Sequence, residues 1–265
     1  VCSSDLNLEL KPYAISSLAD DKTAAVPYTN DFNKDAGFDF KYGITRSMIF
    51  DATVNTDFAQ VEEDLQQVNL TRFSLFFPEK RDFFLEGQGI FAFGGGTLDG
   101  RGGGTEADIP ILFFSRQVGL SKGLSVPVIA GGRLTGRAGK YTVGAINIET
   151  DDHPESGAVK TNFSSLRLKR NVLKNSGVGV LFTNSQDGIS DYNRALGLDG
   201  AWVLGRNITM TTVLAKSFSP TSKGDGTAGV VDYSWKNDRF NYGAQYLDVG
   251  KTFNAEMGYI PRIDI

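Results

Sequence analysis

The stretch VPVIAGGRLTGRAGKYTVGAINIET, residues 126–150, decides the fold of this chain. Side chains of one kind share alternate positions on both sides of a short break at 138–140, as Arg133 and Arg137, four positions apart, do in the first half. A period of two is typical of a β-strand, and a short break that contains glycine is typical of a hairpin turn. The stretch therefore predicts two antiparallel strands, at about 126–137 and 140–150.

The same alternation continues in both directions along the chain. It predicts further strands at about 7–16, 37–44, 48–55, 161–170, 176–184, 193–204, 208–217, 227–235 and 239–248. Short connections alternate with long polar ones, and a long polar loop is expected at 17–35, with DFNKDAG (31–37) as a polar turn. Such a meander, with strands of about 9–11 residues, is typical of outer-membrane barrels. We predict an all-β fold, an antiparallel up-and-down transmembrane β-barrel.

Basic side chains indicate which face of each strand points away from lipid. A cation that faces lipid near the middle of a membrane costs about 2–4 kcal/mol. The predicted lumen-facing residues are therefore Arg133, Arg137, Arg167 and Lys169. The predicted lipid face carries Phe38, Phe40, Val178, Val180, Phe182, Tyr242 and Tyr246. Aromatic residues beside the short turns predict an interfacial girdle of Tyr141, Trp202, Trp235 and Phe240.

Residues 58–125 interrupt the alternation, and we expect them to form a plug-like insertion inside or across the barrel mouth. Their aromatic side chains, among them Phe76, Phe77, Phe83 and Phe84, are too many for a solvated loop and need burial. The segment VEEDLQQV (61–68) is a candidate helix. Its acids Glu62, Glu63 and Asp64 either meet the arginines of the inner wall or solvate the end of the helix.

A charged cluster follows in the same insertion. It consists of Glu79, Lys80, Arg81, Asp82 and Glu86. Paired carboxylates can perform acid–base catalysis, whereas mixed charges can also form the salt bridges of a plug. No feature of the sequence fixes the geometry of a carboxylate pair, so the salt-bridged plug is the favoured interpretation and an enzyme is the less favoured one.

The run DATVNTDFAQVEEDLQQVNLTRFSLFFPEKRDFFLEG (51–87) resembles the most distinctive block of a bacterial outer-membrane barrel family of unassigned function. ILFFSRQVGL, VPVIAGGRLTGRAGKYTVGAINIET and FNAEMGYIPR are similar to further blocks of that family. The resemblance implies a barrel in the bacterial outer membrane. Full-length members also carry an N-terminal domain similar to carbohydrate-binding family 9, which has no counterpart in these residues.

The first six residues, VCSSDL, are expected to be foreign to the protein. They can be encoded by a string that matches the tail of a common short-read sequencing adapter, and they have none of the features of a signal peptide. The predicted strands number about eleven, whereas bacterial single-chain barrels have an even number. We therefore expect residues 7–265 to be a fragment of a barrel domain, whose first and last strands do not pair.

Composition excludes several kinds of function. A net charge of −4 and a pI near 5.2 argue against nucleic acid as a partner. One histidine and one cysteine argue against a metal site, and no cofactor is expected. The favoured function is passage or binding of a solute at the outer membrane, with membrane lipid as one partner and a glycan or other small solute as ligand. The alternatives are an outer-membrane enzyme that uses carboxylates of residues 58–125, and a soluble β-sandwich binding module.

Overall fold

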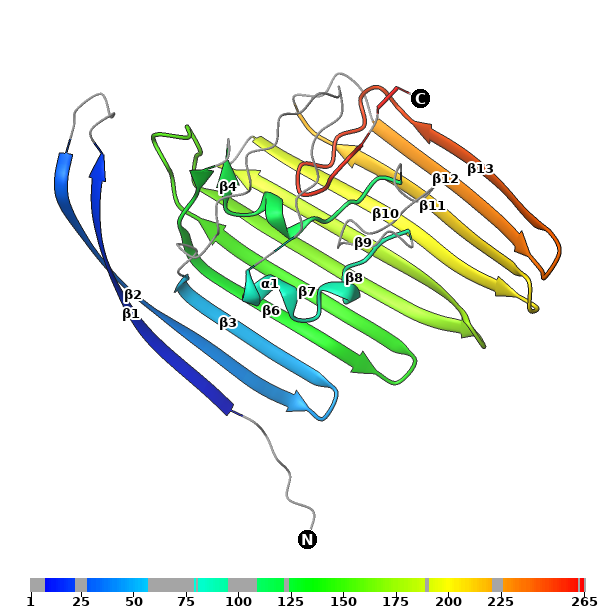
Figure 1. Ribbon diagram of the computed structural model, residues 1–265, viewed down its shortest axis with the longest axis horizontal. Helices are drawn as coiled ribbons and strands as arrows, with labels where there is room; N and C mark the ends of the chain where they lie inside the picture. Colours follow the sequence, from blue (N-terminus) through cyan, green and yellow to red (C-terminus); the bar gives the residue numbers. More distant parts are fainter. Residues whose placement is uncertain are drawn as a thin grey trace, which may run out of the picture.

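Eleven antiparallel strands form one curved sheet in this computed structural model, and nearly every strand pairs with its neighbours in the chain (Figure 1). The structure describes residues 8–21, 28–56, 79, 81–94, 109–121, 124–188, 191–220, 226–261 and 263–264. The strands are β1 (Leu8–Asp21), β2 (Tyr28–Thr45), β3 (Met48–Thr56), β6 (Val128–Ala138), β7 (Tyr141–Thr150), β8 (Thr161–Leu173), β9 (Ser176–Asp187), β10 (Asp191–Leu204), β11 (Ile208–Phe218), β12 (Gly226–Lys236) and β13 (Asn241–Val249).

The sheet is open, with β1 and β13 at its two edges. The predicted antiparallel meander is therefore confirmed, and its strands from β3 onward lie close to the predicted positions. The prediction that the first and last strands do not pair with each other is also confirmed. Strand β1 pairs only with β2 and strand β13 only with β12, so the described strands do not close into a barrel. They also form one large sheet rather than the two packed sheets of a sandwich, apart from a small ladder of β4 (Leu120–Ser121) and β5 (Leu124–Ser125).

The predicted loop at 17–35 is wrong, and so is the predicted turn at 31–37. Strands β1 and β2 continue through most of this region, with Ser16 opposite Lys34 and Leu18 opposite Phe32. The physical reason is that a two-stranded ladder is held by backbone hydrogen bonds, which do not require apolar side chains. Polar composition alone was therefore a poor guide to where this hairpin ends.

The two faces of the sheet differ, and we call inner the face that carries the insertion and the C-terminal segment. The register places Asp51, Arg133 and Ile146 in one row, with side chains on this inner face. Buried residues of β7 to β13 continue the inner face toward the other edge, and they belong to one hydrophobic core with residues of the insertion. These strand residues are Ile146, Ile148, Leu181, Ala195, Val213, Ala215, Ala228, Val230 and Val249.

The described part of the insertion crosses the inner face (Figure 1). It contains the short helix α1 (Asp82–Leu85) and the 3-10 helices η1 (Gln88–Ile90) and η3 (Ser115–Gln117). Phe84, Phe91 and Phe93 are buried, and Phe83 is half-buried. Phe76, Phe77 and the candidate helix at 61–68 lie outside the described residues. In the described part of the chain, no helix has the length and apolar character needed to cross a membrane.

Residues after β13 turn back over the same face. Ile111 and Tyr259 exchange backbone hydrogen bonds of 2.9 and 2.8 Å, and Phe114 donates to the Met257 carbonyl. Asn193 of β10 accepts from the Glu256 amide and donates to the Asn254 carbonyl, at 3.1 Å each. The C-terminal segment is thus attached both to the insertion and to the inner wall.

Candidate functional site

Charges alternate in sign across the first four strands of the inner face. Glu9 of β1 lies opposite Lys41 of β2, Lys41 lies opposite Asp51 of β3, and Asp51 lies opposite Arg133 of β6. Each residue of this row therefore has a neighbour of opposite charge on the adjacent strand, an arrangement that stabilises cross-strand pairs. A second row places Lys11 opposite Asp39, whose carboxylate accepts a hydrogen bond of 2.6 Å from Thr53.

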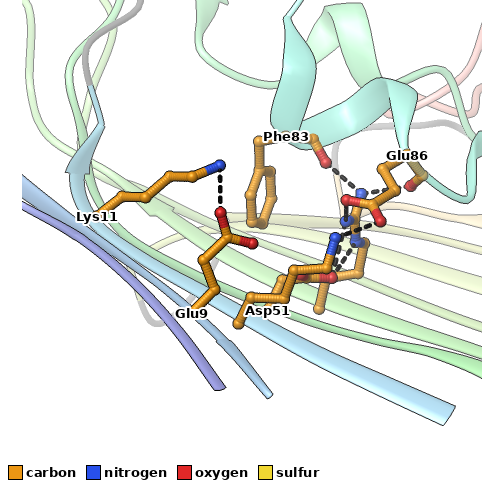
Figure 2. A network of polar contacts seen from close by, with 7 residues as sticks. Glu9, Lys11, Asp51, Phe83 and Glu86 are labelled. Atoms are coloured by element: carbon orange, nitrogen blue, oxygen red, sulfur yellow. Dashed lines mark hydrogen bonds and ion pairs between the residues drawn. The ribbon is translucent and has the colours of Figure 1, made fainter. Parts of the chain in front are cut away.

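Helix α1 covers this charged region from above, as Figure 2 shows. Arg133 is buried, forms an ion pair with Asp51 at 2.8 Å, and donates to the backbone carbonyls of Phe83 and Glu86. Its guanidinium also lies 5.0 Å from the centre of the Phe83 ring. The Glu86 side chain forms ion pairs with Lys41 and, at 3.6 Å, with Arg133. Side chains of the inner wall thus hold the segment from Phe83 to Glu86 at both of its ends.

Between wall and helix lies a polar pocket of about 140 Å³. Its charged lining consists of Glu9, Lys11, Asp39, Lys41, Asp51, Glu86 and Arg133, with Phe40, Ala52 and Phe83 as the apolar part. Four carboxylates against three cations give a formal charge of −1. At about 30 Å³ per water, the pocket holds roughly four or five waters, or one small polar molecule.

A second ion pair attaches the insertion farther along the sheet. Arg167 of β8, with a relative exposure of 1%, binds Asp199 of β10 through two bonds of 2.6 and 2.8 Å. Arg167 also donates to the Ala92 carbonyl at 2.8 Å, while Asp199 accepts from the Gly94 amide at 3.2 Å. This buried pair therefore satisfies backbone groups of a segment that forms no regular structure of its own.

A third pair lies within the insertion itself. Arg81 binds both oxygens of Glu79, at 2.8 and 2.7 Å, and donates to the Val118 and Ser115 carbonyls. Burial alone would raise the pKa of Glu79, but the hydrogen bonds and positive charge of Arg81 outweigh it and hold that pKa below its ordinary value. Glu79 is therefore a carboxylate at neutral pH and cannot serve as a proton donor.

Several predicted site residues take part in these clusters, and others do not. Arg133, Arg167, Glu79, Arg81 and Glu86 form the contacts just described. Arg137 lies exposed beside the β6–β7 turn, and Lys169 is half-buried on the same side of β8 as Arg167. Glu62, Glu63, Asp64 and Lys80 lie outside the described residues, and Asp82 is described only as the first residue of α1.

Sequence reasoning missed the acids of the wall. Asp51 and Asp199 are the described carboxylate partners of Arg133 and Arg167, together with Glu86 for Arg133. Within their own strands, both acids occupy the alternate positions that face inward. The alternation could therefore have predicted that each acid faces inward and can neutralise an inward-facing arginine. Among the described residues no group of three or more His, Cys, Asp or Glu side chains is arranged to hold a metal ion.

Comparison with known families matches residues 4–122 to a domain of unknown function (DUF5916). The match includes β1 to β3 and most of the insertion, and therefore all but one of the charged residues that line the polar pocket, the exception being Arg133. It agrees with the expected resemblance to a family of unassigned function. A search of curated proteins found no match to this sequence.

Proposed function

We propose that this protein resides in the bacterial outer membrane, where the outer face of the sheet meets lipid and the inner face binds a small polar solute for passage or retention. The observation that carries this proposal is the contrast between the two faces. Leu168, Leu198 and Leu214 lie in one continuous outer row across β8 to β11, with 41%, 55% and 65% of their surfaces exposed.

A contiguous apolar surface of this kind is unusual on a monomeric soluble protein, because it would associate in water. We call this surface, which includes Leu168, Leu198 and Leu214, the apolar band. It is bounded by polar side chains toward the long loops and by aromatic rings toward the short turns. Toward the long loops, Asn147 donates hydrogen bonds to Asn162 and Ser164, at 2.9 and 2.8 Å. Toward the short turns, Tyr242 stacks on Trp235 and Phe240 with ring centres 5.6 and 6.1 Å apart. Aromatic rings at such a limit suit a membrane interface.

The polar pocket under α1 is the proposed solute site. Its charge is almost balanced, so a neutral molecule suits it better than an ion. Its donors and acceptors alternate closely, which suits hydroxyl groups because each hydroxyl both donates and accepts hydrogen bonds. We therefore favour a hydroxyl-rich group, such as one edge of a glycan ring or a small polyol, as the ligand.

Membrane residence is tested by expressing the chain in a Gram-negative host and separating its membranes. We expect the chain in the outer-membrane fraction, resistant to alkaline carbonate and extracted only by detergent. Leu198→Lys places a cation in the middle of the apolar band and should reduce membrane assembly, since such a cation costs about 2–4 kcal/mol. Leu204→Lys, beside a short turn, is the matched control and should assemble. A monodisperse, detergent-free protein would contradict the proposal.

Solute binding is tested by calorimetry on the detergent-solubilised protein with a panel of neutral disaccharides. We expect saturable binding of at least one sugar, weakened by Lys41→Met because that change removes a donor and leaves Glu86 with fewer partners. Lys160→Met, at an exposed ion pair with Glu149, is the control and should bind as the parent does. Binding that survives Lys41→Met would place the solute elsewhere.

Catalysis is the less favoured function, because the described carboxylates of the insertion are engaged in ion pairs. Glu79 is bound by Arg81, and Glu86 is bound by Lys41 and Arg133. An activity screen with Glu79→Gln and Glu86→Gln discriminates the two functions. Hydrolysis of a bound sugar that disappears in Glu86→Gln would favour the enzyme.

A further inference from the structure

The short turns at one rim of the sheet carry an excess of positive charge. The hairpin turns of β2–β3, β6–β7, β8–β9, β10–β11 and β12–β13 lie along the same rim (Figure 1). Exposed cations in or beside these turns are Arg46, Arg137, Lys140, Arg170, Lys174, Arg206, Lys236 and Arg239. Asp238 is the single acid among the described residues of the same turns. We call these eight cations the basic rim.

The opposite rim has the reverse character. Among the described residues in or beside its loops, the acids are Glu149, Asp151, Asp152, Glu155, Asp187, Asp191 and Asp248, and the bases are Lys160, Arg194, Lys216 and Lys251. Within the described residues, no member of the basic rim forms an ion pair with a carboxylate, whereas Lys160 does so with Glu149. The charge separation along the strands therefore leaves the basic rim without internal neutralisation and favours an external anion there.

A hollow of about 410 Å³ opens beside this rim, mainly on the outer face. Leu168, Val180, Leu198 and Leu214 form its apolar wall. Arg170 lies at the rim side, with its guanidinium 5.3 Å from the centre of the Tyr141 ring. Gly200, Trp202 and Thr212 line the hollow as well. The Trp202 indole lies over Gly200, where a side chain would collide with it, and donates to the Thr212 hydroxyl at 3.1 Å.

We infer that this hollow binds one glycerophospholipid with an anionic headgroup. Arg170 would hold the phosphate, and an acyl chain would lie along the leucines and Val180. The inference rests on the proposed membrane residence. It goes further by assigning the ligand class, the position on the sheet and the leaflet, because the basic rim would then lie at the headgroups of the leaflet on the short-turn side.

Geometry supports one bound lipid rather than a general attraction to charge. Arg170, Val178 and Gly200 occupy one row across β8, β9 and β10, so the cation and the floor of the hollow are two strands apart. Arg206 lies in the β10–β11 turn and is not among the residues that line the hollow. A cation near an anionic membrane surface contributes about fivefold in affinity, equivalent to about 1 kcal/mol. If one lipid binds specifically in the hollow, Arg170 should contribute more than Arg206 to the affinity for anionic lipid.

Trp202 provides a direct probe, because it lines the hollow and the chain contains two tryptophans. In a Trp235→Phe background, the full chain is reconstituted in phosphatidylcholine vesicles that contain either brominated phosphatidylglycerol or brominated phosphatidylcholine. Bromine quenches tryptophan only on close approach. We expect phosphatidylglycerol to quench Trp202 at about fivefold lower mole fraction than phosphatidylcholine. Arg170→Gln should abolish this preference, and Arg206→Gln should retain it.

The outcomes separate this inference from the proposed function. Equal quenching by the two lipids would overturn the phospholipid site while the membrane proposal stands. Equal loss of preference in Arg170→Gln and Arg206→Gln would also overturn it, because general rim charge would then suffice. Inorganic phosphate that removes the preference would reassign the site to a free anion. No quenching by either lipid, with Trp235 restored as a second probe, would overturn both proposals.

Discussion

Removal of Arg167 should destabilise the protein more than any change of an exposed charge. Arg167→Met keeps the length of the side chain but leaves Asp199, whose side chain is 9% exposed, without its cation. The Ala92 carbonyl loses its donor as well. Loss of one partner of a buried ion pair costs about 3–5 kcal/mol. At about 1.4 kcal/mol per tenfold change, the unfolding equilibrium constant should rise about 140- to 3700-fold.

The measurement is a urea titration of the protein in detergent micelles, followed by tryptophan emission. Hydrogen exchange of residues 91–94 should accelerate in the same variant, because the segment loses its attachment to β8. Lys160→Met is the control, since an exposed pair contributes about 0–1 kcal/mol. Adding Asp199→Asn to Arg167→Met should recover part of the loss, because no uncompensated charge then remains buried. If Arg167→Met costs no more than Lys160→Met, the buried pair does not hold the insertion and the reasoning is wrong.

Three further changes test the other attachments. Gly144→Ala should cost about 1–3 kcal/mol, because its methyl group would lie 2.8 Å from Ile90, whereas Gly243→Ala, with its nearest contact at 3.6 Å, should cost almost nothing in the same titration. Asn193→Ala should cost about 1–3 kcal/mol and accelerate hydrogen exchange of the C-terminal segment, and unchanged exchange would refute its docking role. Glu79 has a lowered pKa, so its stabilisation is complete above the ordinary value of 4.5 and is lost as pH falls through the folded value. Acid should therefore destabilise the parent more than Glu79→Gln, and equal acid sensitivity of the two proteins would contradict this.

The strands were predictable because each lies between two different environments. Strand β7 was expected at 140–150 and spans Tyr141–Thr150, and its inner residues Ile146 and Ile148 alternate with outer Asn147 and Glu149. A period of two is visible in the sequence wherever one face of a strand requires apolar side chains and the other face accepts polar ones. The polar hairpin of β1 and β2 has no such contrast in its distal half, which is why the sequence suggested a loop there.

The site was less predictable, because its contacts are long-range. Asp51 and Arg133 are 82 positions apart, and their pairing depends on β3 meeting β6 across the insertion. Parity indicates that both side chains point inward, but only the register brings them together. The backbone carbonyls of Phe83 and Ala92, which the wall arginines bind, carry no sequence signal at all.

The insertion divides the inner wall into a packed part and an accessible part. Over β7 to β13 its aromatic residues, such as Phe93, join one buried core with wall residues such as Leu181 and Val213. Over β1 to β3 the wall instead presents charges, and the side chains of Lys11 and Glu86 remain 65% and 51% exposed. A solute moving along the inner face would meet dense apolar packing on one side and hydrated, hydrogen-bonding groups on the other. The charged rows of β1, β2 and β3 are therefore where a polar solute can bind without displacing the core, which is why the proposed binding site is placed there.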